Sequence, residues 1–244
     1  MTDLAGRVAL VTGAGRRVGR ALAIALGGRG MHVIVHYHAS ADGAEETARL
    51  VTRAGGSAHL MQADLGNTAD VERLIDDAVA ARGSLEVLVN SAAVMLRTPL
   101  GETSTKDWDA MFALNVRAPY FLAQRAAPAL RAARGNIINI ADLAAFETWP
   151  AYVPHGLTKA AVVQMTRALA RVLAPEVRVN AIAPGVVLLP EGWSDADADR
   201  LRATTPLARL GSPEDVAGAM LYLLDAGFVT GEVITVDGGR HIRK

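Results

Sequence analysis

Apolar residues follow two different periods along this chain. Short runs rich in β-branched residues alternate with longer stretches in which apolar residues recur at helical spacing, from one end to the other. This alternation is typical of an α/β protein in which helices cover both faces of a parallel sheet. The predicted strands are Val8–Thr12, His32–His36, Ala58–Gln62, Val87–Asn90, Asn136–Ile140, Arg178–Ile182 and Val233–Val236. Seven strands fit one open sheet, and we expect residues 1–244 to form a single domain.

The stretches with helical spacing lie between these runs. They begin near Val18, Ala44, Thr68, Asp107, Tyr152 and Pro213, with a shorter one near Ser194. The start at Pro213 is well marked, because Ser212 precedes it as a capping residue and two acidic residues follow it. Residues 186–205 form the longest irregular stretch, and a lid over a ligand is expected in such a loop after a strand.

Charge and composition narrow the possible partners. The 25 lysine and arginine residues balance 25 aspartate and glutamate residues, and no run of like charges is present. The sequence therefore has no basic stripe for nucleic acid and no polybasic membrane patch, which favours a small-molecule partner. The absence of cysteine excludes a disulfide scaffold, a thiolate nucleophile and a Cys-ligated zinc site, and no metal is expected. We expect a cytoplasmic protein, because the N-terminus does not resemble a leader and no apolar run approaches about 20 residues.

The first predicted strand runs directly into a glycine-rich turn. The turn reads Thr12-Gly13-Ala14-Gly15-Arg16-Arg17-Val18-Gly19 and leads into an alanine- and leucine-rich helix. Glycines let the backbone approach a pyrophosphate, and the N-terminus of a helix offers free N–H groups and a partial positive charge. The position of this turn between a strand and a helix favours phosphate binding over an ordinary tight turn.

The second predicted strand ends without an acidic residue. Proteins that bind NAD commonly place an aspartate or glutamate there to accept hydrogen bonds from the ribose hydroxyls. This chain has His36-Tyr37-His38-Ala39-Ser40 instead. A 2′-phosphate would meet no repelling carboxylate, and Arg16, Ser40 and His38 are candidates to bind it. NADP(H) is therefore favoured over NAD(H), although solvated arginines at positions 16 and 17 remain the alternative.

Several further motifs occur in order along the chain. They are Ala63-Asp64-Leu65, Asn90-Ser91-Ala92-Ala93, Asn115, Lys159, Arg178-Val179-Asn180, Pro184-Gly185, and the segment from Thr230-Gly231 to Val236-Asp237-Gly238-Gly239. With the glycine-rich turn, they resemble the short-chain dehydrogenase/reductase family from Arg7 to Gly239. The chain is most similar to the pteridine reductase branch, through the turn, the HYHAS segment and the aspartate at position 142.

The resemblance implies a fold, a cofactor site and an assembly. The fold is a single-domain Rossmann fold with a seven-stranded parallel sheet and helices on both faces, and the assembly is a homotetramer. The candidate cofactor-binding residues are Gly13, Arg16, Arg17, Val18, Gly19, Tyr37, His38, Ser40, Asp64, Leu65, Asn90, Ser91, Ala92, Lys159, Pro184, Gly185 and Val187. Asp64 and Leu65 are expected at the adenine, and Pro184 to Val187 at the nicotinamide amide.

The family's proton-transfer tyrosine is replaced in this chain. Family members transfer a hydride with a tyrosine as acid or base and a lysine four residues later, so that both side chains point at one ligand. Lys159, in an apolar helix, is the candidate lysine, with a snorkelling surface role as the alternative. Four residues before it stands His155. Asn115 matches the asparagine that supports a bound-water relay, and Asp142 stands where most members have a serine.

The sequence leaves the role of His155 open. Imidazole is a competent general acid near neutral pH, and an ionised Asp142 would favour its protonated form, whereas Lys159 would oppose it. A working or adapted acid at His155 and a loss of proton transfer there both fit the residues. Asp142 also fits a purely capping role. Tyr152 lies about 10 Å from Lys159 along a helix and is expected to line the pocket instead.

The predicted pocket has few aromatic residues. Met95 stands where pteridine reductases place a stacking ring, and Trp149 and Trp193 flank the pocket, each as a flat wall or as packing only. The leading hypothesis is an NADP(H)-dependent reductase of a small carbonyl, imine-type or pterin-like substrate. A non-catalytic NADP(H)-binding relative is the rival, and a dehydratase or isomerase has the least support. Independently, Met111–Leu130 and Ala160–Leu173 are apolar around much of their circumference, which predicts burial against another subunit.

Overall fold

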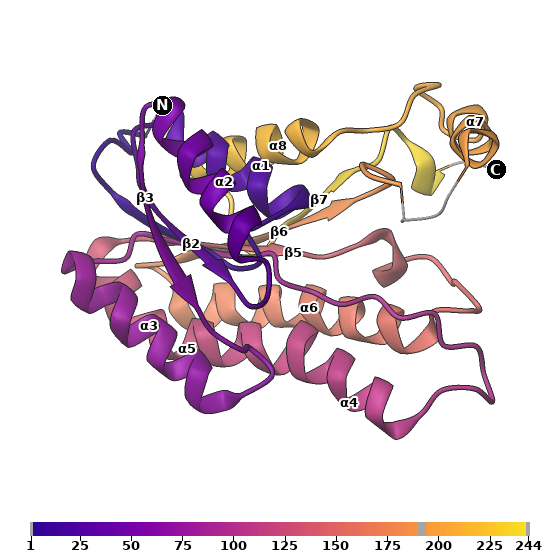
Figure 1. Cartoon of the computed structure of the whole chain (residues 1–244), viewed down its shortest axis with the longest axis horizontal. Coiled ribbons are helices and arrows are strands. Elements are labelled where there is room, and N and C mark those ends of the chain that lie inside the picture. The colour runs from indigo at the N-terminus through magenta and orange to yellow at the C-terminus, as the bar shows by residue number, and fades with distance from the viewer. Residues whose placement is uncertain (1, 190–193, 243–244) are drawn as a thin grey trace.

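The computed structural model describes residues 2–189 and 194–242 and shows one parallel sheet of seven strands (Figure 1). The strands are β1 (Val8–Val11), β2 (His32–Tyr37), β3 (Ser57–Gln62), β4 (Val87–Asn90), β5 (Asn136–Ile140), β6 (Arg178–Pro184) and β7 (Val233–Val236). Their order in the sheet is β3-β2-β1-β4-β5-β6-β7. The chain therefore reverses direction across the sheet between β1 and β4, and a crevice forms outside the carboxyl ends of strands at such a point.

Helices cover both faces of the sheet. They are α1 (Arg17–Gly27), α2 (Ala41–Arg53), α3 (Thr68–Arg82), α4 (Thr105–Phe112), α5 (Ala118–Ala133), α6 (Val153–Leu173), α7 (Asp195–Ala203) and α8 (Pro213–Asp225). Figure 1 shows α1, α2 and α8 on one face and α3 to α6 on the other, and the helix-to-helix contacts agree. This is the Rossmann arrangement that the sequence predicts.

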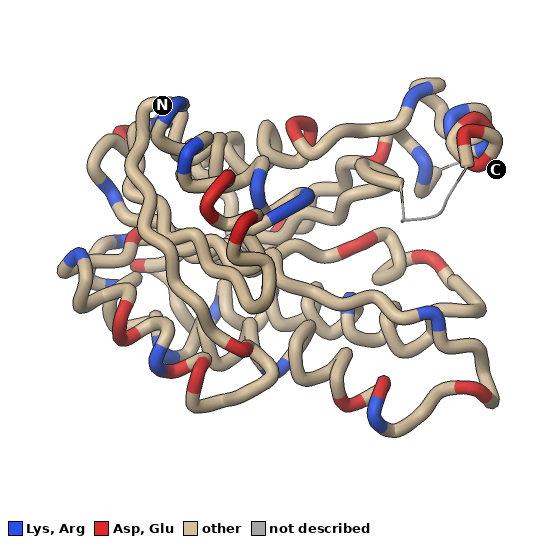
Figure 2. The backbone as a smooth tube through the Cα atoms, viewed as in Figure 1, with Lys and Arg blue, Asp and Glu red and all other residues tan. Residues whose placement is uncertain are grey.

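Successive side chains of a strand point to opposite faces of the sheet, so each face has its own hydrophobic core. In β1, Ala9 and Val11 pack in the core beneath α1 and α8, whereas Val8 and Leu10 pack with α3 and α5. Strands buried on both faces tolerate few charges, and Arg178 is the one Asp, Glu, Lys or Arg residue in the described strands. Its guanidinium donates hydrogen bonds to the carbonyl oxygens of Leu223, Leu224 and Val229. Figure 2 shows the charges mainly on helices and loops around the sheet.

The element boundaries differ from the predicted ones in a few places. β1 ends one residue early, and β6 continues to Pro184 because Ala183 and Pro184 pair with β7. The helical stretch predicted from Asp107 is α4, a π-helical turn η1 (Ala113–Arg117) and α5 in succession. Part of the irregular stretch 186–205 is helix α7, which begins with a capping box at Ser194. Within residues 2–189 and 194–242, no helix has both the length and the hydropathy needed to span a membrane.

Candidate active site and nucleotide cleft

A cavity of about 2030 Å³ lies at the carboxyl ends of the strands. Its walls come from the segments that follow β1 to β6, which brings together residues far apart in the sequence. Every candidate cofactor-binding residue lines this cavity except Asn90, and so do Asp142 and His155. Asn90 and Asn115 line a much smaller cavity of about 10 Å³, which also touches Lys159. The large cavity has room for a dinucleotide together with a small substrate.

The glycine-rich turn lies close to the segment that follows β4. Gly13 has a φ of +65°, and a Cβ atom there would lie 2.9 Å from Cα of Ala92. Only glycine meets both conditions without strain. The turn leads into α1, whose N-terminus opens on the cavity together with the exposed side chains of Arg16 and Arg17. The arrangement offers an anion both backbone N–H groups and charge.

The rim beside the end of β2 has the residues expected for a 2′-phosphate. His38 is exposed, Ser40 is half-buried, and both line the cavity together with Arg16. Ser40 is the N-cap residue of α2, yet its hydroxyl makes no capping hydrogen bond. The nearest acidic residue in sequence, Asp42, does not line the cavity. A phosphate at this rim would therefore meet two or three donors and no carboxylate from β2 or its following turn.

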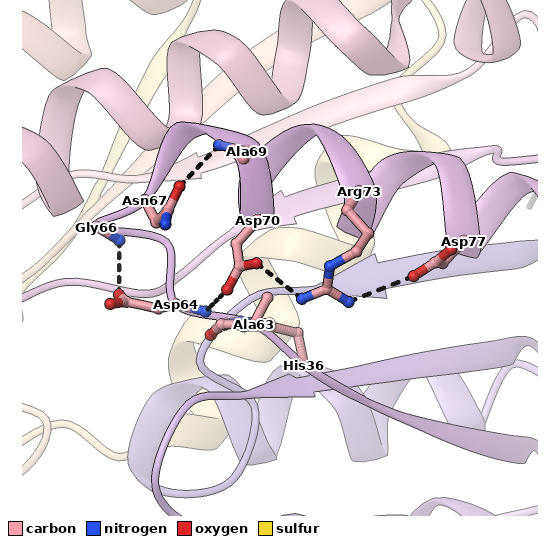
Figure 3. Close-up of polar contacts among 9 residues, drawn as sticks. All are labelled: His36, Ala63, Asp64, Gly66, Asn67, Ala69, Asp70, Arg73 and Asp77. Carbon is pink, nitrogen blue, oxygen red and sulfur yellow. Dashed lines mark hydrogen bonds and ion pairs between the residues drawn. The ribbon is translucent and has the colours of Figure 1, made fainter.

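The segment between β3 and α3 is fixed by a chain of hydrogen bonds (Figure 3). The Asp64 carboxylate accepts from the backbone N–H of Gly66 at 2.8 Å, and the Asp70 carboxylate accepts from the backbone N–H of Asp64 at 2.9 Å. The hydrogen bond from Asp64 and the neighbouring Arg73 guanidinium both lower the pKa of Asp70. Because the segment is held this way, Asp64 and Leu65 occupy defined positions on the cavity wall.

Two residues that organise the cleft were not singled out from the sequence. The hydroxyl of Thr12 accepts hydrogen bonds from the backbone N–H groups of Ser91 and Ala92, which fixes the segment after β4. The ring of His36 bonds both the glycine-rich turn and the segment after β3. One feature of the sequence could have indicated both residues. Each is a polar residue at or next to the carboxyl end of an apolar strand, where a side chain can reach the loops that follow the neighbouring strands.

Asn90 is a structural link rather than part of the large cavity wall. Its amide donates to the side chain of Asn139 at 2.9 Å, and the amide of Asn139 donates to the hydroxyl of Thr166 at 2.9 Å. These bonds tie β4 to β5 and α6. The sequence predicts that Asn90 lines the nucleotide cleft, whereas in the structure it does not line the large cavity and borders only the small one.

Lys159 is buried in α6 rather than exposed on the surface. Its side chain is 5% exposed, and its ammonium donates to the carbonyl oxygen of Ile140 at 2.9 Å. Burial lowers the pKa of Lys159, and the carboxylate of Asp142 opposes that change. The snorkelling alternative is therefore wrong, because this lysine is buried and lines the cavity instead of extending over the outer surface.

Asp142 and His155 lie side by side with unequal access to the cavity. Nε2 of His155 is 3.5 Å from Oδ2 of Asp142, and the side chains are 2% and 26% exposed respectively. The other carboxylate oxygen of Asp142 accepts from the backbone N–H of Ala144 at 2.9 Å. Neither ring nitrogen of His155 has a hydrogen-bond partner among the described residues. Asp142 therefore serves as a cap and also presents its carboxylate to the cavity, with the imidazole behind it.

Asn115 sits in the π-helical turn between α4 and α5. Its side chain accepts from the backbone N–H of Val94 at 2.8 Å and donates to the carbonyl of Val94 and to the hydroxyl of Thr158. Thr158 in turn donates to the carbonyl oxygen of His155 at 2.7 Å. The asparagine thus connects the turn after β4 to the start of α6, a contact that the sequence alone did not show.

The far end of the cavity has an aromatic wall. The rings of Trp149 and Tyr152 meet edge to face with their centroids 6.3 Å apart, and the indole donates to the carboxylate of Glu147. Both residues line the cavity, as does Met95, which is 41% exposed. Tyr152 precedes α6 rather than forming part of it, and it lies on the cavity wall as the sequence predicts. Trp193 lies outside the described residues.

Comparison with known proteins shows which family the chain belongs to. A family profile described as enoyl-(acyl carrier protein) reductase matches residues 13–241. The chain is 36% identical to a 3-oxoacyl-[acyl-carrier-protein] reductase of Synechocystis over 98% of both chains. It is 34% identical to 3beta-hydroxysteroid dehydrogenase 1 of Eggerthella lenta, over 97% of this chain and 94% of the other. The chain belongs to the short-chain dehydrogenase/reductase family. It is therefore an oxidoreductase of a family that uses nicotinamide cofactors.

The three-dimensional comparison agrees with the family. A crystal structure described as a putative short-chain alcohol dehydrogenase from Sinorhizobium meliloti superposes with a TM-score of 0.94 at 32% identity, covering 99% of both chains. A Serratia marcescens short-chain dehydrogenase/reductase variant gives a TM-score of 0.91 at 34% identity, over 98% of this chain and 100% of that one. The match spans the sheet and the segments that form the cavity.

Proposed function

We propose that the protein is an NADP(H)-dependent reductase of a small carbonyl or pterin-like substrate, with His155 in place of the usual catalytic tyrosine. The observation that carries this proposal is the large cavity, in which an anion-binding turn and the group of Lys159, Asp142 and His155 face one space. A nucleotide end and a reacting end in one cleft are what hydride transfer requires.

The preference for NADP(H) rests on the rim beside β2. Arg16 is exposed there, and the hydroxyl of Ser40 makes no capping hydrogen bond. Charge-assisted hydrogen bonds to a 2′-phosphate are each worth about 1.5–3 kcal/mol, which corresponds to a tenfold or greater gain in affinity. The absence of a carboxylate at this rim supports the same preference, because it removes the acceptor for a free ribose hydroxyl.

At the reacting end, this chain's residues supply charge and protons. When bound, NADPH supplies the hydride, and a carbonyl or C=N substrate must gain a proton on oxygen or nitrogen as its carbon gains the hydride. Asp142 is the accessible group of the pair, so it faces the substrate atom that takes the proton. His155 lies behind Asp142 and is positioned to replace the proton that Asp142 gives up. Lys159, held by the carbonyl of Ile140, supplies positive charge at the cofactor ribose.

The substrate end of the cavity favours a flat molecule. Trp149, Tyr152 and Met95 provide aromatic and polarizable surface beside Asp142. A dihydropterin has a flat heterocycle of this kind and a C=N bond to reduce. Small dicarbonyl compounds are the other candidate substrates, because their carbonyl oxygen needs a proton that Asp142 and His155 could supply.

A matched set of variants tests these roles. Asp142→Asn keeps the size of the side chain but removes the carboxylate that could take up and release a proton, and we expect NADPH consumption to fall more than a hundredfold. Asp109→Asn is the control, because Asp109 lines the same cavity from α4 and has no assigned role. Equal activity of the two variants would remove Asp142 from the mechanism.

A non-catalytic NADP(H)-binding relative is the second candidate function. The observation in its favour is the burial of both ring nitrogens of His155, which leaves no exposed imidazole N–H at the reacting end. This candidate predicts tight NADPH binding without turnover on any substrate. A turnover that depends on Asp142 or His155 would exclude it.

The oligomeric state and the location belong to the same proposal. Tyr120 on α5, with Leu157 and Val172 on α6, are 44%, 48% and 65% exposed, so these helices keep apolar side chains outside the monomer core. We propose that copies of the chain bury these surfaces against one another in a homotetramer, and that the protein works in the cytoplasm. Sedimentation equilibrium should give four times the chain mass of 25.6 kDa, and a monomer would refute the assembly.

A further inference from the structure

His36 lies buried between two loops that line the nucleotide cleft. The side chain is 2% exposed and stands in β2, one residue before the strand ends. Its Nδ1 atom accepts a hydrogen bond from the backbone N–H of Gly13 at 3.1 Å. Its Nε2 atom lies 3.1 Å from the carbonyl oxygen of Ala63. One ring thus contacts the glycine-rich turn on one side and the segment after β3 on the other.

The backbone at the end of β2 reinforces both contacts. The carbonyl oxygen of His36 accepts from the N–H of Ala14 at 2.9 Å, and the carbonyl oxygen of Tyr37 accepts from the N–H of Ala63 at 3.1 Å. Each loop is therefore held by one bond to the backbone and one bond to the ring. The ring bonds add a second hold on each loop, at the N–H of Gly13 and at the carbonyl oxygen of Ala63.

The two partners define the protonation state of the ring. A backbone N–H can only donate and a carbonyl oxygen can only accept, so Nδ1 must be bare and Nε2 must carry the hydrogen. The imidazole is thus neutral and present as one tautomer. Burial lowers the pKa of His36 to about 4, with a further contribution from His38 and an opposing one from the Ala63 bond, so this state persists at neutral pH.

The two peptide groups held by the ring lead directly to the cavity. Gly13 lies against Ala92 and lines the cleft, and Asp64 follows Ala63 on the cavity wall. Asp64 is held from its other side by the carboxylate of Asp70 (Figure 3). The glycine-rich turn and the Asp64 segment therefore share a buried side-chain connector, in addition to the backbone of β2.

We propose that His36 is a positioning residue for the nucleotide, which sets the glycine-rich turn and the Asp64 segment at a fixed separation before the cofactor binds. The inference rests on the proposed function to the extent that the nucleotide is NADP(H). Preformed loops bind without the entropy cost of ordering, so loss of the ring bonds weakens affinity more than it alters the fold.

Titration of NADPH fluorescence against three variants tests the proposal. His36→Leu keeps an apolar side chain of similar size but removes both bonds, and we expect the Kd for NADPH to rise at least tenfold. His36→Asn keeps an acceptor at the Nδ1 position but loses the bond to Ala63, and we expect its Kd to lie between those of the natural protein and His36→Leu. His32→Leu is the matched control at the opposite end of β2, where the ring contacts Ser57, and its Kd should not change. A natural Kd in His36→Leu would overturn the proposal. So would a Kd for His36→Asn no lower than that of His36→Leu, provided that both variants melt at the same temperature.

A second measurement separates this inference from the proposed cofactor. Amide hydrogen exchange of Gly13 in the cofactor-free protein reports on the ring bond itself. We expect exchange to accelerate at least tenfold in His36→Leu and to stay near the natural rate in His36→Asn. If the natural protein binds no NADPH, the proposed function fails, while unchanged Gly13 exchange in His36→Leu is the result that refutes the positioning role.

Discussion

Acid pH should destabilise this protein through His36 in a way that can be measured. Burial lowers the pKa of the ring from 6.5 to about 4 in the folded protein, whereas the unfolded chain keeps the ordinary value. The unfolded chain therefore takes up a proton first. The stability that the neutral ring provides is fully present above pH 6.5 and is lost progressively as the pH falls toward 4.

The size of this effect follows from the pKa difference. Each pH unit within that window costs about 1.4 kcal/mol, because one pKa unit corresponds to that free energy. Between neutral pH and pH 5, the titration of His36 alone should lower the free energy of unfolding by about 2 kcal/mol. This is a sizeable part of the total, since domains are stable by only about 5–15 kcal/mol.

Urea unfolding of the natural protein and His36→Asn provides the assay. Asparagine does not titrate, and the other five of the six histidines are common to both proteins. The free energy of unfolding, compared at pH 7.5 and pH 5, should fall by about 2 kcal/mol more in the natural protein than in the variant. Equal slopes of the free energy with urea concentration would show that the unfolded states are comparable. An equal loss of stability in both proteins would refute the reasoning, because it would mean that His36 is not held neutral by the fold.

Three further predictions address the cleft and the sheet. Gly13→Ala should raise the Kd for NADPH more than tenfold in fluorescence titration, because a Cβ atom would meet Ala92 at a φ of +65°; unchanged affinity would contradict the close approach. Arg16→Ala should raise the Kd for NADPH about tenfold or more and change the Kd for NADH less than twofold. An equal loss of affinity for both cofactors would show that Arg16 does not bind the 2′-phosphate. Arg178→Leu removes three hydrogen bonds from the guanidinium to carbonyl oxygens, so denaturant unfolding should show a loss of about 2–3 kcal/mol. A loss below about 0.5 kcal/mol would refute this reasoning.

Hydrophobic patterning was enough to predict the sheet. All seven predicted strands are present, and Val87–Asn90, Asn136–Ile140 and Val233–Val236 have the predicted bounds. The reason is that strands buried on both faces are continuous apolar runs, which stand out against amphipathic helices. The π-helical turn at Ala113–Arg117 was not predicted, because one extra residue in a helical turn leaves the apolar spacing almost unchanged.

The site was only partly readable from the sequence. Spacing predicted that His155 and Lys159 lie near each other, and the family resemblance added Asp142 to them; the structure brings all three to one cavity. The sequence did not show that the side chain of His155 is more buried than that of Asp142, because the burial of each side chain depends on how its neighbours pack. Thr12 and His36 stand in quoted motifs, but their own roles were not predicted, because their partners are backbone groups of other segments and such contacts have no signature in residue spacing.

NADPH consumption measures the central proposal most directly. The natural protein, His155→Tyr and Lys159→Ala are compared over a panel of dihydropterins and small dicarbonyl compounds at several pH values. We predict that the natural protein oxidises NADPH with at least one of these substrates and that Lys159→Ala loses more than tenfold of that rate. If the natural protein binds NADPH but turns over nothing, and only His155→Tyr is active, the proposal of a working reductase is contradicted and the non-catalytic alternative stands.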